Sequence, residues 1–501
     1  MSITTPKFCV SILPKTLEQL TDWISNLEAA DIVEVRLDYL RSINIRVVKD
    51  LIKIPIIVTI RSVEEGGYFA ASKSVLVNLY QQAIDAGVGF LDIDYQNAAV
   101  ILPKLKLNLK TKLILSCHSQ ENKLDALKGI LNEMKNTKAN VYKLVFKAYE
   151  LNDNRMALYL IDYAKELNIQ FVIHAQGDEG TLSRILGNLM GNSWTYVSLD
   201  DQSQTAPGQL SIHQAKGKYY LPEKNQNCCL IGLVGFPVSQ SKGWLIYNRL
   251  FHLLRSDKSS DNSMSNSIYL NFSTKSLSEF WKNWHDKLDG LSVTIPHKEN
   301  ILQFADIKSK EVALTGVCNT LAKRNGKWYA YNTDYLAIFE LLKPFQKLLL
   351  KKSVLVYGTG ATARSVIVAL KKLDVQNLLV MGRNKTRGQF LKKLFSITFS
   401  EKDSDLPELS AIIQATPVGM YPNSKKTPDC AKLLKKGMIA FDVIFNPPIT
   451  QFLKSAKEKG CRLISGEEMY FQQAIRQFEL FTGHRISLNY FVDVWKDLLT
   501  N

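Results

Sequence analysis

The chain has 501 residues, of which 46% are hydrophobic and 22% are charged, and its formal net charge at pH 7 is +16. This length predicts about three globular domains, and no apolar run approaches the length that spans a bilayer, which excludes a membrane-spanning helix. The lysines and arginines are spread along the chain, a distribution that favours solubility and attraction of small anions over binding of nucleic acid.

The seven cysteines are odd in number and scattered, without a C-x-x-C spacing. This pattern argues against a disulfide scaffold and against a zinc site, so we expect no metal. The first residues lack the features of a signal or transit peptide. We therefore expect a cytoplasmic protein that binds neither membranes nor nucleic acid; the sequence does not indicate an oligomeric state.

Strand-like and helical segments alternate from residue 1 to about residue 215. The strand-like runs are Phe8–Ile12, Ile32–Tyr39, Pro55–Arg61, Phe90–Tyr95, Lys112–His118, Asn140–Phe146, Gln170–Gln176 and Trp194–Leu199. Helical periodicity marks segments such as Lys15–Ala29, Ser72–Ala86, Lys123–Lys135 and Asn152–Leu167. Eight alternations in roughly 210 residues predict a TIM barrel, whose active site lies at the carboxyl ends of the strands.

Charged residues stand at the ends of these strands. They are Glu34, Arg36, Asp38, Arg61 and His118. Lys143 instead lies inside the sixth strand, where a lysine is rare. Burial near arginines lowers the pKa of a lysine and frees an amine for Schiff-base chemistry, and a nearby His118 suits proton transfer. The alternatives are a lysine at a frayed strand edge and a histidine that is only a satisfied polar residue.

An ordered set of motifs runs through this half. The motifs are Glu34-Val-Arg36-Leu-Asp38, Thr59-Ile-Arg61-Ser-Val-Glu-Glu65, Leu-Ser-Cys-His118, Tyr-Lys143-Leu, Ser183-Arg184 and Thr205-Ala-Pro-Gly-Gln209. The set resembles the type I 3-dehydroquinate dehydratases over the whole barrel. The resemblance implies an imine between Lys143 and the substrate ketone, with His118 as acid and base and Glu65 orienting it.

The same resemblance implies that Arg184 pairs with the substrate carboxylate, and that no cofactor is needed. It implies that further residues line the pocket: Glu34, Arg36, Arg61, Thr205 and Gln209. Two features depart from the pattern, because His174 and Gln176 stand where many relatives carry methionines, and Thr205 replaces a serine. These departures concern the pocket wall rather than the chemistry.

A polar, lysine-rich segment, 215–227, indicates a domain boundary, and strand–helix alternation restarts near Cys229. The Ser/Asn/Asp-rich segment 255–267 predicts a mobile surface loop. Lys298 follows a strand that Pro296 stops, while Asn319 and Asp334 follow later apolar stretches. Each polar residue alone can be a turn residue or a helix cap, but together they suit the acid/base group of a dehydrogenase.

A nucleotide-binding pattern follows. The run from Ser353 to Tyr357 leads into Gly358-Thr-Gly360-Ala361-Thr-Ala363, the order of strand, glycine turn and helix that holds a pyrophosphate. By itself this motif is equally typical of a tight turn. The next strand ends in Gly382-Arg383-Asn384-Lys385-Thr386-Arg387, and basic residues at this point favour the 2′-phosphate of NADP over NAD.

The second half carries another ordered set of motifs. They are Gly235-Phe-Pro-Val-Ser-Gln-Ser241, Val-Thr294-Ile-Pro-His-Lys298, Gly316-Val-Cys-Asn319, Tyr331-Asn-Thr-Asp334, the glycine turn, Ala415-Thr416-Pro-Val418-Gly-Met420 and Met469-Tyr-Phe-Gln-Gln473. The set resembles shikimate dehydrogenase over about residues 230–501. The resemblance implies NADPH-dependent reduction of 3-dehydroshikimate, with Lys298 and Asp334 as the acid/base pair.

The resemblance also implies two sets of contacts. Substrate contacts are Ser241, Thr294, Asn319, Gln473 and Gln477. Cofactor contacts are Gly358, Gly360, Ala361, Ala363, Arg383, Asn384, Arg387, Thr416, Val418 and Met420. Two hydroxyl groups of the family are missing, because Gly243 replaces a serine and Phe445 replaces a tyrosine. Gly243 leaves space for the additional hydroxyl group of quinate, so we expect some tolerance of quinate.

Together the two halves resemble the fused 3-dehydroquinate dehydratase/shikimate dehydrogenase of the plant type. The expected fold is α/β: a (β/α)8 TIM barrel at 1–217, an α/β substrate domain at 228–336 plus 467–501, and a Rossmann NADP domain at 337–466. The expected ligands are 3-dehydroquinate, 3-dehydroshikimate, shikimate and NADP(H). Two alternatives stay open: a second half that is mainly a quinate dehydrogenase, and a non-catalytic ligand-binding regulator.

Overall fold

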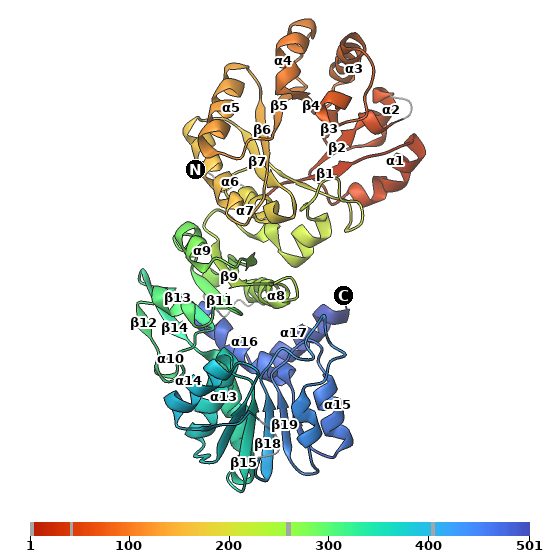
Figure 1. Ribbon diagram of the computed structural model, residues 1–501. Coiled ribbons are helices and arrows are strands. Elements are labelled where there is room, and N and C mark those ends of the chain that lie inside the picture. The colour runs from red at the N-terminus through yellow and green to blue at the C-terminus, as the bar shows by residue number, and fades with distance from the viewer. Residues whose placement is uncertain (1–4, 41–43, 257–261, 402–405, 501) are drawn as a thin grey trace. The chain divides into compact units, whose positions relative to one another are not determined.

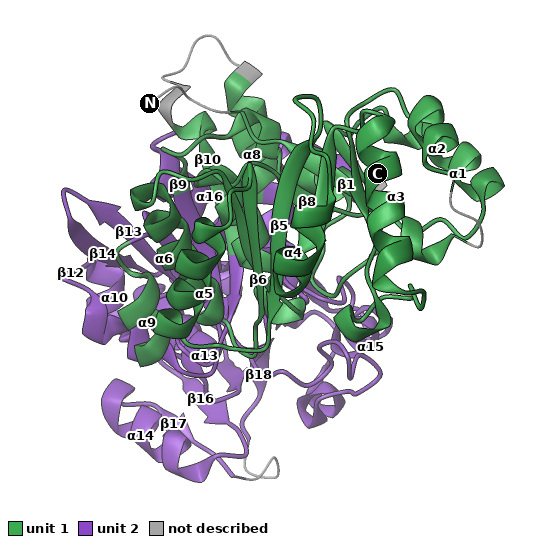
Figure 2. Ribbon diagram, turned by 90° about the horizontal axis from the view of Figure 1, so that it is seen from above, with its two compact units in different colours: residues 1–229, 247–270, 278–286 green, residues 230–246, 271–277, 287–501 purple. Residues whose placement is uncertain are grey.

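The computed structural model describes residues 5–40, 44–256, 262–401 and 406–500. The chain divides into two compact units (Figure 2). Unit 1 comprises residues 1–229, 247–270 and 278–286, and unit 2 comprises residues 230–246, 271–277 and 287–501. The three-domain boundaries expected from the sequence stay a prediction.

Eight parallel strands form the sheet of the first 200 residues (Figure 1). They are β1 (Phe8–Ile12), β2 (Ile32–Arg36), β3 (Ile56–Thr59), β4 (Phe90–Asp94), β5 (Lys112–Ser119), β6 (Val141–Lys147), β7 (Phe171–Gln176) and β8 (Thr195–Val197). Their hydrogen-bonded order is β7-β6-β5-β4-β3-β2-β1-β8, a nearly closed α/β barrel. Each strand had been predicted within a few residues. Parallel strands covered on both faces read as continuous apolar runs, which made them easy to recognise.

Seven α-helices connect these strands and cover the barrel. They are α1 (Leu17–Trp23), α2 (Ile45–Leu51), α3 (Lys73–Asp85), α4 (Tyr95–Ile101), α5 (Leu124–Asn136), α6 (Asp153–Glu166) and α7 (Thr181–Leu189). Side chains cap three of them at the N-terminus, as when Asn44 accepts a hydrogen bond from the Val47 amide. Between β8 and residue 229 the chain forms short helical turns at Gln214–Lys218 and Leu221–Glu223.

The segment 215–227, which was expected to mark a domain boundary, is anchored by buried side chains. Ala215 and Leu221 are fully buried within it, and Lys224 donates a hydrogen bond to the carbonyl of Ser265. A few apolar residues among the lysines are enough to anchor the segment. The predicted loop 255–267 lies partly outside the described residues; Arg255 belongs to α8 (Gly243–Ser256), and Ser267 begins β10 (Ser267–Ser273).

A second, mixed sheet has the order β10-β9-β11-β13-β14-β12. The remaining strands are β9 (Cys229–Gly235), β11 (Gly290–Val293), β12 (Ile307–Lys308), β13 (Thr320–Arg324) and β14 (Lys327–Tyr331). Helices α9 (Leu277–Trp284) and α10 (Lys310–Thr315) lie between these strands in the chain, and α11 (Thr333–Leu342) follows β14. β11 pairs parallel with β9 and antiparallel with β13. This arrangement puts the segment after β11, which carries Lys298, beside the turn that precedes β13 at Asn319.

A third sheet is parallel throughout, with the order β17-β16-β15-β18-β19-β20. Its strands are β15 (Ser353–Tyr357), β16 (Leu378–Met381), β17 (Thr398–Phe399), β18 (Leu409–Gln414), β19 (Ile439–Asp442) and β20 (Arg462–Ile464). Its helices are α12 (Gln346–Leu349), α13 (Ala361–Lys372), α14 (Lys385–Phe395) and α15 (Gln451–Glu458), and the chain ends in α16 (Gly466–Thr482) and α17 (Leu488–Thr500).

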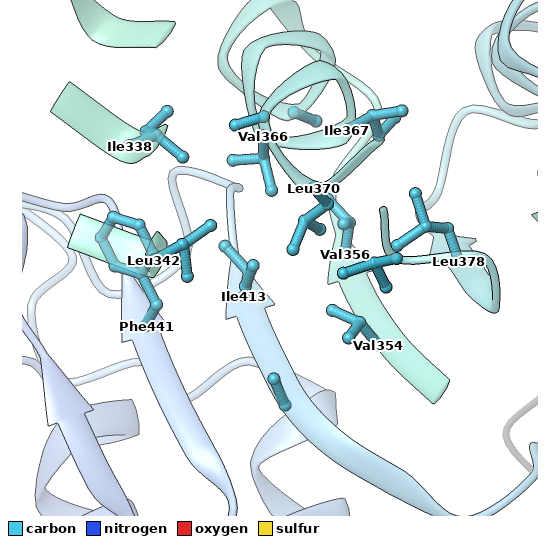
Figure 3. Packing of buried hydrophobic residues seen from close by; sticks show 14 of the residues in the cluster. Ile338, Leu342, Val354, Val356, Val366, Ile367, Leu370, Leu378, Ile413 and Phe441 are labelled. Carbon is cyan, nitrogen blue, oxygen red and sulfur yellow. The ribbon is translucent and has the colours of Figure 1, made fainter. Parts of the chain in front are cut away.

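Apolar side chains from strands and helices meet on one face of this third sheet (Figure 3). Val354 and Val356 of β15 and Ile413 of β18 pack against Val366 and Leu370 of α13, and all five are fully buried. This packing fixes the turn between β15 and α13, where a nucleotide-binding motif was expected. The predicted fold class, an α/β barrel followed by two further α/β sheets, is confirmed. No helix in the described part of the chain is long and apolar enough to cross a membrane.

Candidate active sites

Lys143 of β6 lies inside the barrel, and its side chain is almost completely buried. Its Nζ is 3.3 Å from Oδ2 of Asp92 and 3.5 Å from Oε1 of Glu34, and it lies 4.1 Å from the ring centre of Tyr196. The lysine is therefore not at a frayed strand edge. The nearest charges are carboxylates, whereas the sequence had suggested arginines.

The four residues of this cluster come from alternate strands, since Glu34 is on β2, Asp92 on β4, Lys143 on β6 and Tyr196 on β8. Alternate strands of such a barrel contribute side chains to the same interior layer. Burial by itself raises the pKa of Glu34, but the charge of Lys143 and a hydrogen bond from Ser11 outweigh it and lower the pKa to about 2. The carboxylate is thus held in its charged form beside the lysine.

His118 is the second-last residue of the neighbouring strand β5, and it is exposed at the carboxyl end of that strand. Desolvation by the surrounding protein, with the charges of Arg61 and Lys143, holds the pKa of His118 well below its ordinary value. A neutral imidazole of this kind can accept a proton, as a general base must.

The hydrogen bonds of the Glu65 carboxylate are made with residues other than His118. One of its oxygens accepts a hydrogen bond from the Ser62 amide at 3.1 Å, and the other accepts one from the Asn97 side chain. Glu65 caps the short helical turn Val63–Glu65, and this local role holds its carboxylate in place. Within the described residues no hydrogen bond links Glu65 and His118.

Among the described residues, Arg184 of α7 is a buried cation without an ion-pair partner. Its guanidinium is buried, its Nε has no hydrogen-bond partner, and burial lowers its pKa to about 10. An uncompensated buried charge is costly, so its position suits a residue that awaits an anionic ligand. Arg36 differs, because both Nε and one terminal nitrogen donate to Asp38, at 2.9 and 2.8 Å.

The remaining predicted pocket residues are partly engaged by the protein. Arg61 lies 3.9 Å from Asp92 and 3.7 Å from Asp94, and Asp94 has a pKa raised to about 6 by desolvation. In the loop after β8, the amide and hydroxyl of Thr205 donate to Oε1 of Gln209 at 2.8 and 2.9 Å. The structure thus places these two residues together.

Sequence reasoning missed several polar residues of the barrel interior. The missed residues are Ser11, Thr59, Asp92, Asp94, Ser116 and Tyr196. Ser116 donates to Asp92 at 2.5 Å, and Thr59 donates to Glu34 at 3.0 Å. A usable signal existed, because Asp92 and Asp94 stand two apart in an otherwise apolar strand and so share one face.

The second cluster lies in unit 2 and centres on Lys298 and Asp334. Nζ of Lys298 is 2.6 Å from Oδ2 of Asp334, and both side chains are largely buried. Asp334 lies in the first turn of α11, whose cap is Asn332. Asn332 is therefore a helix cap, as one of the alternatives proposed, while Asp334 faces the lysine.

Amide side chains surround this pair. Nδ2 of Asn319 donates to Oδ1 of Asp334 at 2.9 Å and lies 3.4 Å from Oε1 of Gln473 in α16. Gln477, one turn further along α16, donates to Thr320 at 2.8 Å and to the carbonyl of Asn319 at 3.0 Å. The structure thus brings together predicted residues that are up to 158 positions apart.

Two other predicted substrate residues lie near strand ends. Thr294 directly follows β11, and its amide donates to the carbonyl of Val234. Oγ of Ser241 accepts a hydrogen bond from the amide of Gly243 at 3.3 Å. Phe445, which stands where the family has a tyrosine, packs with its ring centre 4.2 Å from that of Tyr470. Phe445 itself therefore supplies no hydroxyl group.

A cavity of about 1090 Å³ opens between the Lys298 segment and the glycine turn. Predicted cofactor residues line it: Gly358, Gly360, Ala361, Arg383, Asn384, Arg387, Thr416 and Val418. Ala363 is fully buried in the core of α13 and does not line the cavity, and Met420 is also outside its lining. A buried small residue at position 363 lets helix and strand pack closely, which is a structural role.

The cavity fits a dinucleotide. Gly358 has φ of +140°, and a Cβ there would lie 2.6 Å from the carbonyl oxygen of Ala415, so only glycine fits the turn. At Gly360 an added Cβ would meet no atom within 4 Å, so this face is open to a ligand. Gly360 also caps α13, whose first amides can hold a phosphate. Basic residues at 383, 385 and 387 also line the cavity.

Comparisons with known proteins agree with both clusters. A family model described as type I 3-dehydroquinase matches residues 8–226, and one described as shikimate dehydrogenase substrate binding domain matches residues 233–321. A bifunctional 3-dehydroquinate dehydratase/shikimate dehydrogenase of Arabidopsis thaliana is 27% identical over 505 residues, covering 95% of this chain and 82% of that protein.

A shikimate dehydrogenase (NADP(+)) of Clostridium perfringens is 30% identical over 276 residues, covering 54% of this chain and 98% of that protein. A solved structure of dehydroquinate dehydratase and shikimate dehydrogenase from S. pombe is 23% identical, with a TM-score of 0.43, and covers 99% of this chain and 98% of that one. The chain therefore belongs to the shikimate dehydrogenase family, and a type I 3-dehydroquinase precedes that part in the same polypeptide.

Proposed function

We propose that the chain catalyses two consecutive reactions: dehydration of 3-dehydroquinate in the barrel, and NADPH-dependent reduction of 3-dehydroshikimate to shikimate in the second half. The observation that carries the proposal is the placement of the two predicted catalytic lysines. Lys143 contacts two buried carboxylates inside the barrel, and Lys298 pairs with Asp334 at the edge of a cavity that fits a dinucleotide.

In the barrel, the amine of Lys143 would attack the ketone of 3-dehydroquinate and expel water to form an imine. The imine makes the neighbouring C–H acidic, and neutral His118 would remove that proton and then return it to the departing hydroxyl group. Arg184, which has no partner at Nε, would bind the substrate carboxylate. This half needs no cofactor for these steps.

In the second half, Lys298 would hold the carbonyl oxygen of 3-dehydroshikimate and supply a proton to it as the alcohol forms. Asp334 would keep the Lys298 ammonium in position, and Asn319 and Gln473 would bind ring hydroxyl groups. NADPH bound in the cavity supplies the hydride. Ser241 and Thr294 would contact the substrate, and Thr416 and Val418 would border the nicotinamide.

Two measurements test the proposal. Borohydride reduction in the presence of 3-dehydroquinate is expected to add the reduced substrate to a peptide that contains Lys143, as detected by mass spectrometry. NADPH consumption is expected with 3-dehydroshikimate. If the pure protein forms no adduct and consumes no NADPH, the non-catalytic regulator is the better interpretation.

A second candidate activity is oxidation of quinate. Gly243 begins α8 without a side chain two residues after Ser241, and Phe445 offers no hydroxyl group, so two donors to the carboxylate that the family supplies are missing here. Each missing hydrogen bond costs about 1–3 kcal/mol if nothing replaces it. Quinate should then be oxidised with a kcat/KM within about a hundredfold of that for shikimate. If quinate is not oxidised while shikimate is, this activity is ruled out.

We also retain the domain boundaries expected from the sequence, with the dehydratase at 1–217, the substrate domain at 228–336 plus 467–501, and the NADP domain at 337–466. All seven cysteines are free thiols, which supports a reducing compartment such as the cytoplasm. Limited proteolysis that releases an active dehydratase would support the first boundary, and a cut within 1–217 as the first event would contradict it.

A further inference from the structure

Glu299 is, with Asp429, an acidic residue that lines the cavity expected to hold a phosphate. It directly follows Lys298 and lines the same cavity as the glycine turn. Its Oε2 lies 3.2 Å from a terminal nitrogen of Arg364, and its Oε1 forms an ion pair with Arg387. Arg387 is one of the residues expected to bind the 2′-phosphate of NADP.

The two arginines that hold Glu299 differ in burial. The Arg364 side chain is 12% exposed, its Nε has no partner, and it packs so closely on Gly316 that a Cβ there would lie 2.2 Å from its terminal nitrogen. Arg387 is 47% exposed on the first turn of α14. Glu299 therefore has a fixed partner in Arg364 and an exchangeable partner in Arg387.

We propose that Glu299 is a specificity-determining residue, because its carboxylate competes with the 2′-phosphate of NADP for Arg387. The inference rests on the proposed NADP-dependent function. A phosphate binds a guanidinium through two hydrogen bonds and more strongly than the exposed carboxylate of Glu299 does. The 2′-phosphate therefore replaces Glu299 as the partner of Arg387, while Glu299 keeps its ion pair with Arg364. NAD has a hydroxyl group in that place and gains nothing from the exchange.

The test is a binding titration of Glu299→Gln with NADP⁺ and NAD⁺, followed by calorimetry and without any turnover. An exposed ion pair of this kind corresponds to an expected gain of about two- to fivefold in affinity for NADP⁺. Affinity for NAD⁺ should change by less than about twofold. Glu408→Gln is the matched control, because it also removes one exposed carboxylate, paired with Lys352, away from the cavity.

A double-mutant cycle with Arg387→Gln separates the competition from a general charge effect. Arg387→Gln should weaken NADP⁺ but not NAD⁺ binding, and Glu299→Gln should have no further effect in that background. If Glu299→Gln does not fold, Glu299→Asp serves instead, since the shorter side chain cannot span both arginines, and the same selective gain is expected.

The outcomes separate the inference from the function on which it rests. Three results would overturn the inference if the native protein binds NADP⁺. They are that Glu299→Gln has the same affinities as Glu408→Gln, that it binds both nucleotides more tightly by the same factor, or that it binds NADP⁺ more weakly. If the native protein binds neither nucleotide, the proposed dehydrogenase function fails, and the inference fails with it.

Discussion

The two candidate active sites use the same residue type in different surroundings. Lys143 lies within a strand, in contact with two carboxylates and the ring of Tyr196. Lys298 lies just after a strand, pairs with one carboxylate and borders an open cavity. A lysine that forms a covalent bond must meet its ketone in one fixed geometry, whereas a proton donor needs only reach and access. The packing around each lysine therefore matches a different reaction.

The supporting residues differ in the same way. In the barrel they come from alternate strands, so the β-sheet itself sets their spacing. In the second half, Asn319, Asp334 and Gln473 come from a turn and two helices, and side-chain hydrogen bonds set their spacing. We expect the barrel site to depend on the stability of the whole fold and the second site to depend on individual side chains.

The largest expected effect follows from Lys143→Met, which keeps the length of the side chain but removes the amine. Dehydratase activity should fall by about a thousandfold or more, because no other residue can form the imine. Dehydrogenase activity of the same preparation should be unchanged and serves as the folding control. Retention of dehydratase activity would show that the two lysine sites do not differ in chemistry as proposed.

Lys298→Met should have the reciprocal result. Loss of a positioned proton donor costs roughly 10²–10⁴-fold in kcat, so NADPH consumption should fall by that factor while dehydratase activity persists. The binding of NADPH, measured by fluorescence, should stay within a few-fold of the native value. A fall in both activities would instead indicate that the variant is misfolded.

Replacement of Glu34 tests how much the charged groups of the barrel site contribute to the stability of the folded protein. Its pKa is about 2 in the folded protein against 4.5 without the fold, so the ionised carboxylate stabilises the native state above pH 4.5, and this contribution disappears as the pH falls to about 2. Glu34→Gln should therefore lower the protection of β6 amides against hydrogen exchange at pH 7, by an amount on the order of 3 kcal/mol.

The difference between this variant and the native protein should become small as the pH falls to about 2, where about half of the Glu34 side chains are protonated. Glu18→Gln is the matched control, because Glu18 is an exposed glutamate of α1. If Glu34→Gln and Glu18→Gln give the same protection at pH 7, the carboxylate does not couple the site to the fold.

The smallest expected effect concerns the nucleotide turn. In Gly358→Ala the new Cβ would sit on a residue with positive φ and would clash with the Ala415 carbonyl oxygen. The substitution should therefore destabilise the protein by about 2–3 kcal/mol and weaken NADP⁺ binding. Gly437→Ala has a φ of +84° but open space around it, and should cost only about 1 kcal/mol. Urea unfolding compares the two variants, and equal costs would show that the contact at position 358 is not restrictive.

Much of the fold could be predicted because its signals are local. Parallel strands covered on both faces are continuous apolar runs, and their helices have a period of 3.6, so the element order is visible along the chain. The end of β2 was misjudged at Tyr39, because Arg36 turns back to Asp38 and residues Leu37–Tyr39 form a short helical turn. Such a side-chain contact does not change the hydrophobic periodicity of the sequence, so the end of the strand could not be predicted from it.

The sites were predicted less completely. Lys143, His118, Lys298 and Asp334 stood out because ordered motifs surround them. Asp92 and Ser116 did not, because their partners lie on other strands: Ser116 of β5 donates to Asp92 of β4, and Asp92 lies beside Lys143 of β6. Glu299 was missed for the same reason, since its two arginine partners lie 65 and 88 positions further along the chain.

The sequence by itself determined which elements form and which reactive residue types stand at their ends, because helix period, strand composition and glycine turns are properties of adjacent residues. Only the tertiary structure decided which of those residues meet. In the folded protein the neighbours of Lys143 are two carboxylates instead of arginines. Glu65 accepts hydrogen bonds from Asn97 and Ser62, and Glu299 forms an ion pair with Arg387. Electrostatic energy depends on distance and burial, and both are fixed only when remote segments pack together.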